Sequence, residues 1–447
     1  MLLLALFLGL SAPAWSAPAI AASSSGYVVR VDSDVVYLDL GSGSGARAGE
    51  SFRVYTLGPA LIDPATGKNL GQPKSFVAEG RLTDVEALYS EGVLVSFSTS
   101  VAAGMRAELY VEPAADAVQA PPAGTSAAPA PAGRKPRWRS PWFNFPVAAF
   151  VIADFSGAGK DRIALASRKT VRLYAYPPQG AKALAEFTVP GIGSRLVSLE
   201  SAPAASSGPA RLLATFYDDA LDRMETDVLA VSSGAWVLEQ NIPWMVRTYQ
   251  RPDGARALAA QQLLDDETFP FSAIYPLIDS DGRFAPGDKA LKPVGSDWLY
   301  GFTQISLDSA PAELSITDTH RLEVKSAQGK WENADSFGRT PVRLRWQGKL
   351  LEFYPPMPVI DAPEGPSVFL VRNESRFGAM AEAFGIFDNA EIIRENWSDD
   401  AFAPAWTSEV PGFVTNLALV GPAEHPKDLV AAVSTRSGKS SIWIYDP

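Results

Sequence analysis

The stretch Val147–Ser167, VAAFVIADFSGAGKDRIALAS, aligns without a gap with Val414–Ser434, VTNLALVGPAEHPKDLVAAVS. After each copy a short apolar segment ends in tyrosine, at Thr170–Tyr174 and at Ser441–Tyr445. Both copies have the pattern of a strand, a polar loop, a strand, a turn and a strand. Because one such unit cannot bury its own apolar face, its return near the end of the chain indicates a circular repeat architecture.

Weaker copies of the same pattern lie between these two. Their starts are spaced as expected for four-stranded propeller blades that carry insertions. They are Arg195–Leu199, Ala210–Phe216 and Asp227–Val231; Ala257–Leu264 and Phe271–Leu277; Leu299–Leu307, Ala312–Thr317 and Arg321–Lys325; and Ser367–Arg372 and Glu382–Phe387. We therefore expect an all-β chain with a six- or seven-bladed β-propeller. A β-sandwich is the alternative, because it produces the same strand pattern.

Composition divides the chain into four parts. Residues 1–22 form an uncharged apolar start, and residues 26–112 alternate apolar and polar positions in short runs with glycines at the joints, as in a small β-barrel. Residues 113–140 begin as a Pro/Ala-rich linker and end in a basic cluster, Arg134–Arg139. Residues 141–447 hold the repeats and are expected to form the propeller.

The first residues resemble a secretory signal peptide. The apolar run Leu2–Leu10 precedes small residues that suit cleavage near Ala17 or Ala22, and the run is too short to span a bilayer. No other apolar stretch reaches spanning length, so we expect no transmembrane segment in the mature chain. These features predict export to the periplasm or beyond it.

The 447-residue chain contains no cysteine, so disulfides and thiolate metal sites are excluded. Its formal net charge is −11, and the negative charge lies in the barrel and propeller regions, whereas the linker is basic. An acidic surface repels phosphate groups, which argues against nucleic acid as a partner.

The loop of the first repeat is rich in Asp and Gly. The segment Asp154–Asp161, followed by Arg162–Ala166, resembles the repeat of the FG-GAP and VCBS families. Four later segments resemble bacterial envelope proteins that carry such repeats: Leu351–Pro358, Phe369–Ser375, Ala405–Phe413 and Asp428–Val433. The resemblance covers residues 145–447 and implies an integrin-like propeller that binds proteins rather than an enzyme.

In those families the loop often binds calcium through oxygen ligands at alternate positions. The corresponding residues here are Asp154, Ser156 and Asp161, whereas position 158 is alanine. These three residues are the candidate calcium ligands that the resemblance implies. The alternative is a structural turn, in which the Asp154 carboxylate accepts backbone N–H bonds. No other cofactor is expected.

The first domain has a separate resemblance. Gly41–Tyr55, Asp63–Gly71 and Tyr89–Gly92 are similar to the C-terminal domain of the flagellar assembly protein T and to related periplasmic small barrels. The resemblance supports a periplasmic location and does not imply a flagellar role, because such barrels occur in other envelope proteins.

Residues for catalysis are scarce. The chain has two histidines, His320 and His425, and each is interpreted as a lone surface imidazole without neighbours at metal-ligand spacing. Gly41–Gly45 resembles a phosphate-binding loop in composition, but a strand rather than a helix is expected to follow it. We therefore expect no catalytic site.

Two further features keep alternatives open. The Arg134–Arg139 cluster, with Trp138 and Trp142, is interpreted either as a dock for an anionic lipid, cell-wall polymer or acidic partner, or as a joint whose tryptophan packs on the propeller. The tryptophans either line a sugar-binding face or fill the space between blades. Seven of them are Trp236, Trp244, Trp298, Trp331, Trp397, Trp406 and Trp443.

Together these observations predict a non-enzymatic periplasmic scaffold, a protein-binding platform of a bacterial envelope assembly whose partners are envelope proteins. In this hypothesis the barrel anchors to an envelope component, the linker gives reach, and the propeller presents a binding face. The alternative is a propeller that binds polysaccharide or calcium.

Overall fold

The computed structural model describes residues 24–447 apart from short gaps and one long one. The chain divides into two compact units, Met1–Pro113 and Ala114–Pro447. The predicted signal peptide, linker residues 113–131, the Asp63–Gly67 part of the barrel motif and His425 lie outside the described residues. The gaps are 33–34, 48–49, 63–67, 98–100, 111–131, 181, 192–193, 203–207, 219, 266–269, 292–295, 308–309, 348, 363–364, 377–380, 383–384, 399 and 422–425.

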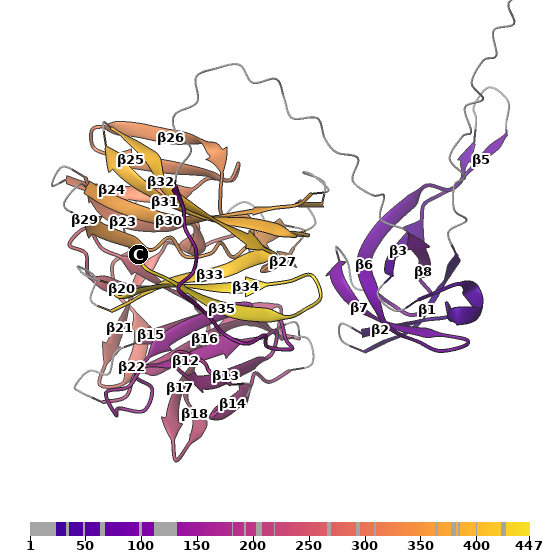
Figure 1. Cartoon of the computed structure of the whole chain (residues 1–447), viewed down its shortest axis with the longest axis horizontal. Helices are drawn as coiled ribbons and strands as arrows, with labels where there is room; N and C mark the ends of the chain where they lie inside the picture. The colour runs from indigo at the N-terminus through magenta and orange to yellow at the C-terminus, as the bar shows by residue number, and fades with distance from the viewer. Residues whose placement is uncertain are drawn as a thin grey trace, which may run out of the picture. The chain divides into compact units, whose positions relative to one another are not determined.

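The first unit is a closed barrel with strand order β1-β2-β7-β6-β3-β8, so the expected small barrel is confirmed (Figure 1). Pairing of β1 with β8 closes it, and apolar residues such as Val36, Leu38, Phe52 and Val54 fill its interior. The barrel strands are β1 (Ser25–Asp32), β2 (Val35–Leu38), β3 (Ser51–Leu57), β6 (Lys74–Val85), β7 (Ser90–Phe97) and β8 (Arg106–Tyr110).

Two features of the barrel lie outside its closed sheet. The glycine-rich segment after β2 forms a single 3-10 turn, η1 (Ser42–Ser44), which ends at Gly45 with φ of +86°. The next element is strand β3 and not a helix, as expected from the sequence, so the glycine-rich segment lacks the helix that a phosphate-binding loop requires. Between β3 and β6, β4 (Leu61–Ile62) and β5 (Asn69–Gly71) pair as a separate two-stranded ribbon, and β5 stands away from the barrel body (Figure 1).

The second unit is a six-bladed propeller, numbered here in chain order (Figure 1). Blade 1 is β11 (Ala149–Ala153), β12 (Arg162–Ala166), β13 (Thr170–Ala175) and β14 (Ala185–Thr188); blade 2 is β15 (Arg195–Ala202), β16 (Arg211–Asp218), β17 (Arg223–Ser232) and β18 (Ala235–Ile242); blade 3 is β19 (Met245–Gln250), β20 (Arg256–Gln261), β21 (Tyr275–Ser280) and β22 (Arg283–Pro286); blade 4 is β23 (Phe302–Leu307), β24 (Ala310–Ile316), β25 (Arg321–Ser326) and β26 (Gly329–Ser336).

Segments from before the first blade complete the last two. Blade 5 is β29 (Val359–Ala362), β30 (Gly365–Glu374), β31 (Asn389–Ser398), β32 (Ala401–Pro411) and the parallel strand β9 (Ala132–Gly133); blade 6 is β33 (Phe413–Val420), β34 (Asp428–Ser434), β35 (Ser440–Tyr445) and β10 (Trp138–Arg139). Contacts run from β11 to β15, β19, β23, β30 and β33 and back to β11, which closes the ring.

An insertion separates blades 4 and 5. It forms the hairpin β27 (Arg343–Trp346) and β28 (Lys349–Glu352). Its buried side chains, including Leu344 and Trp346, join a core with Val197 and Met245, which lie near the beginnings of β15 and β19. The short helix η2 (Leu299–Gly301) joins the same core. The insertion therefore packs against the beginnings of these inner strands.

The sequence repeat forms the junction between blades 1 and 6. In β12, Ile163 and Leu165 pack in one core with Val430 and Ile442 of blade 6, while the intervening Ala164 and Ala166 face blade 2. Alternate residues of a strand point to opposite faces, so large and small side chains serve different neighbours. The Thr415 hydroxyl of blade 6 also donates to the Val147 carbonyl, over 2.8 Å.

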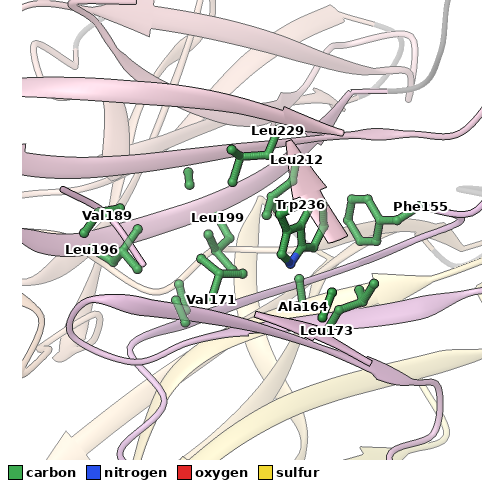
Figure 2. Close-up of a cluster of buried hydrophobic side chains, with 14 of the residues drawn as sticks. Phe155, Ala164, Val171, Leu173, Val189, Leu196, Leu199, Leu212, Leu229 and Trp236 are labelled. Atoms are coloured by element: carbon green, nitrogen blue, oxygen red, sulfur yellow. The ribbon is translucent and has the colours of Figure 1, made fainter. Parts of the chain in front are cut away.

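The core between blades 1 and 2 contains one of the tryptophans. Trp236 lies edge-on to Phe155, with ring centroids 5.5 Å apart, and both are buried. Figure 2 shows side chains of the two blades, among them Val171, Leu199 and Leu212, meeting in one cluster. This cluster holds neighbouring blades together by burying apolar area.

One expected strand is wrong. Glu382–Phe387 was predicted to be a strand of the same repeat copy as Ser367–Arg372, but β31 begins later, at Asn389. The Gly385 and Ile386 N–H groups donate to the Glu382 and Ala381 carbonyls, so the backbone there forms a local turn. Because Gly385 has φ of +75°, the chain turns before the strand starts.

Candidate binding site in the central channel

A cavity of about 570 Å³ lies in the channel that the six inner segments surround. Its lining comes from every blade and lies toward the ends of β15, β19 and β33, away from the beginnings that the insertion packs against. The main contributors are Phe150–Ile152, Leu199–Ala202, Arg247–Gln250, Tyr300 with Phe302 and Thr303, Pro356–Val359 and Asn416–Leu419. Concave, largely apolar sites with a few polar groups are typical ligand sites.

Two of the polar groups in the channel are a buried ion pair. The Arg247 Nη1 atom lies 3.6 Å from Glu200 Oε1, and both side chains are almost fully buried. Burial raises the pKa of Glu200, while Arg247 and hydrogen bonds from Thr248 oppose that shift. Arg247 also donates to the Tyr354 carbonyl, over 3.3 Å, and so connects blades 2 and 3 to the segment before blade 5.

A second arginine crosses the channel. Arg256 is the first residue of β20 and lies opposite Gln250, the last residue of β19. Its Nη2 atom donates to the Leu419 carbonyl of blade 6, over 2.9 Å, although Arg256 belongs to blade 3. Blades 3 and 6 are opposite each other in a six-membered ring. Arg256 as a residue is exposed to solvent, while partial burial of its guanidinium lowers the Arg256 pKa and the charge of Glu200 opposes that shift.

Tyr300 supports the Arg247 guanidinium. Its ring centroid lies 5.2 Å from Arg247 Cζ, and its hydroxyl is hydrogen-bonded with Ser198 Oγ and donates to the Val246 carbonyl. Burial raises the pKa of Tyr300 to about 12, so the phenol is neutral at physiological pH. The guanidinium is thus held by a salt bridge, a carbonyl and an aromatic face.

The predicted calcium loop lies between β11 and β12. The Asp154 Oδ1 atom accepts hydrogen bonds from Ser156 N, Ser156 Oγ and Ala158 N, and Oδ2 accepts one from Gly159 N over 2.6 Å. Burial opposes ionisation, but these bonds outweigh it and lower the pKa of Asp154. Asp161 lies exposed at the end of the loop. Asp154 therefore caps the turn, and the calcium site stays a prediction.

The interpretation of His320 as a lone surface imidazole is wrong. Its Nε2 atom lies 3.4 Å from Glu352 Oε2, and its ring meets Tyr354 edge-on at 5.9 Å. Burial and the charges of Arg339 and Arg343 lower the pKa of His320 to about 4, so the imidazole is neutral at pH 7. The hairpin β27–β28 brings Glu352 to this position, which the spacing along the chain did not reveal.

The basic cluster packs on the propeller. Arg137 pairs with Asp428, and the Arg139 Cζ atom lies 3.9 Å from the Trp443 ring centroid. Trp138 is partly buried against the core between blades 1 and 6. These contacts match the interpretation of the segment as a joint.

The tryptophans named from the sequence are in or beside the cores between blades. Trp236, Trp406 and Trp443 are buried, and Trp331 lies edge-on to Trp397 with centroids 6.0 Å apart. Their indoles fill the space between sheets, which widens toward the rim of a propeller.

The channel residues Glu200, Arg247 and Arg256 were not identified from the sequence. For Glu200 and Arg247 the available signal was a charge that follows apolar residues inside a strand, as in Leu196-Val-Ser-Leu-Glu200 and Met245-Val-Arg247. A buried charge needs a partner, so such positions indicate a contact between strands that are distant in the chain.

No family model and no curated protein sequence match the chain. Solved structures with a similar fold include BBS1N in complex with ARL6DN, with 11% identity, TM-score 0.31 and coverage of 67% of this chain and 79% of that one. The subtype N11 neuraminidase-like protein of A/flat-faced bat/Peru/033/2010 (H18N11) has 12% identity and TM-score 0.38, and the match covers 70% of this chain and 94% of that one. The Dos1 propeller has 8% identity and TM-score 0.32, and the match covers 67% of this chain and 78% of that one. These similarities say nothing about function.

Proposed function

We propose that this protein is a non-enzymatic scaffold of a bacterial envelope assembly in the periplasm, and that its N-terminal barrel attaches it to an envelope protein. The observation that carries the proposal is the apolar ribbon, defined as β4 and β5. The resemblance to FG-GAP and VCBS repeats and to periplasmic barrels supports the same role, and the signal-like start supports export.

The apolar ribbon exposes most of its hydrophobic surface. Leu61, Ile62 and Leu70 are 52%, 54% and 62% exposed, and Leu61 and Ile62 pair with Gly71 and Asn69 on the opposite strand. A two-stranded ribbon that buries none of its large side chains has little stability of its own. Neighbouring exposed apolar side chains are typical of protein-binding surfaces. We therefore expect the apolar ribbon to bind an apolar groove on an envelope protein.

The propeller contributes a rigid platform to this proposal. Its ring is closed by β10 on blade 6 and by apolar cores between blades, such as the one between blades 1 and 6. Among the described residues no helix is long and apolar enough to cross a bilayer. Attachment through a protein partner is consistent with this arrangement.

The test is photo-crosslinking in intact cells with a photoreactive residue at position 61 or 70. We expect one defined envelope protein as the adduct at both positions. The matched control is position 350, because Leu350 is 44% exposed and lies in another two-stranded hairpin of the same chain. Ile62→Glu, added to the chains that carry the photoreactive residue at position 61 or 70, should abolish the adduct. The same diffuse products at positions 61, 70 and 350, unchanged by Ile62→Glu, would refute the proposal.

A further inference from the structure

We propose that the channel is a binding site for a small organic carboxylate with an apolar body, held by Arg256. This site is separate from the apolar ribbon and goes beyond the scaffold role. The proposal is based on the absence of a salt bridge to Arg256 among the described residues, on its available donors and on the character of the cavity walls.

Each carboxylate of the cavity lining already has an arginine partner other than Arg256. Glu200 is paired with Arg247, and the other carboxylate of the lining, Asp279, accepts hydrogen bonds from Arg211 and from the Gly282 N–H. Arg256 forms no salt bridge among the described residues, although the charge of Glu200 acts on it. Arg256 is therefore the cation of the lining with which a ligand carboxylate can pair.

The donors of Arg256 are available. A guanidinium carries five N–H donors in a fixed plane. Among the described residues, the Arg256 side chain uses one of them, toward the Leu419 carbonyl. Its other donors remain in a solvent-exposed channel, and a carboxylate matches their geometry with two parallel hydrogen bonds. The neighbouring Arg247 is already held by Glu200, by the Tyr354 carbonyl and by the Tyr300 ring, so Arg256 supplies the donors for the ligand.

The walls favour an apolar body on the ligand. Phe150, Phe302, Met357 and Leu417 line the cavity around these polar groups. The volume of about 570 Å³ lies within the range of small-molecule sites. A bare inorganic anion would leave the apolar walls in contact with water, whereas an organic carboxylate uses both features.

The competing explanation is that Arg256 is only a structural link across the channel. A link needs one hydrogen bond to blade 6 and no ligand, so its loss lowers stability without changing any binding. The experiment therefore measures affinity and stability on the same variants.

The probes are 4-bromophenylacetate and its neutral amide, titrated into the full-length protein by calorimetry. We expect the acid to bind about tenfold more tightly than the amide, as expected for charge-assisted hydrogen bonds. Arg256→Gln should remove this preference, and Arg256→Lys should retain part of it, because lysine keeps the charge but lacks the planar donor pair. Crystals soaked with the acid should show anomalous bromine signal in the channel.

The matched control is Arg251→Gln. Arg251 lies in the turn between β19 and β20, pairs with Asp253 and is not part of the cavity lining. This variant should bind the acid as the wild type does. Equal affinity for acid and amide, no binding of the acid at millimolar concentration, or a preference that survives Arg256→Gln would each overturn the proposal. If only the melting temperature changes in Arg256→Gln, the residue is a structural link.

Discussion

Replacing Trp236 by alanine is expected to lower the free energy of unfolding, because it weakens the packing between blades 1 and 2. The indole is 8% exposed and lies against Phe155 in the core that joins the two blades (Figure 2). Burying about 200 Å² of indole at about 25 cal/mol/Å² contributes roughly 5 kcal/mol. Among the described residues the Nε1–H has no acceptor, which offsets about 1 to 2 kcal/mol of this gain. The expected net loss is about 3 to 4 kcal/mol, within the usual range for such substitutions.

The assay is differential scanning calorimetry of the full-length protein. For a unit of about 300 residues, a loss of 3 kcal/mol lowers the melting temperature by roughly 5 °C. Trp236→Phe should cost less than about 1.5 kcal/mol, because the ring still fills the site and the unpaired N–H is removed. The matched control is Trp142→Ala, since Trp142 is 47% exposed and should shift stability by less than about 0.5 kcal/mol.

Two results would refute this reasoning. If Trp236→Ala and Trp142→Ala lowered the melting temperature equally, burial between the blades would not be the source of the stability. If Trp236→Phe were as costly as Trp236→Ala, the indole N–H rather than the ring area would be the stabilising group.

Three other predictions concern carboxylates of the propeller. Burial first, and the charge of Asp335 second, raise the pKa of Glu395 from 4.5 to about 7, so the folded state loses stability as pH rises through that interval. Glu395→Gln should therefore raise the free energy of unfolding at pH 8 by up to about 3 kcal/mol, with a higher melting temperature, and leave both unchanged at pH 4. A gain of equal size at both pH values would contradict this prediction. Asp428→Ala should lower the free energy of unfolding, measured by calorimetry, by about 2 to 3 kcal/mol, because it leaves the Tyr176 hydroxyl and Arg137 without their shared acceptor. The control Asp446→Ala should lower it by less than about 1 kcal/mol, because the Asp446 side chain is 58% exposed. Asp154→Ala should lower the melting temperature by the same amount with calcium or with chelator, because both carboxylate oxygens already accept bonds from the loop; a loss seen only with calcium would instead support a metal site.

Much of the fold was predictable from local patterns. Strand alternation identified β15, β16 and β24 closely, because each strand must present one face to each neighbouring blade. The barrel was predictable for the same reason. The predicted strand Leu299–Leu307 was wrong in its first three residues, which form η2. The pattern failed at Glu382–Phe387, where the Gly385 and Ile386 N–H groups donate to nearby carbonyls of the same segment rather than to a neighbouring strand. It also missed β10, because a two-residue strand has no periodicity to detect.

The candidate site was less predictable than the fold. Asp154 was recognised because its partners lie within the next five residues, at Ser156, Ala158 and Gly159. The channel residues depend on partners far along the chain, such as Leu419 for Arg256. No local rule relates two such positions, since their approach depends on how many blades separate them around the ring.

The sequence by itself determined the repeated unit, the all-β class and the separate barrel, because these depend on side-chain periodicity over a few residues. The tertiary structure decided that the two clearest copies, Val147–Ser167 and Val414–Ser434, lie side by side where the ring closes. It also decided that Arg247 and Arg256 enter one channel with Glu200. The physical reason is that closing the ring brings the inner strands around one axis, so charges that are isolated along the chain become neighbours across the channel.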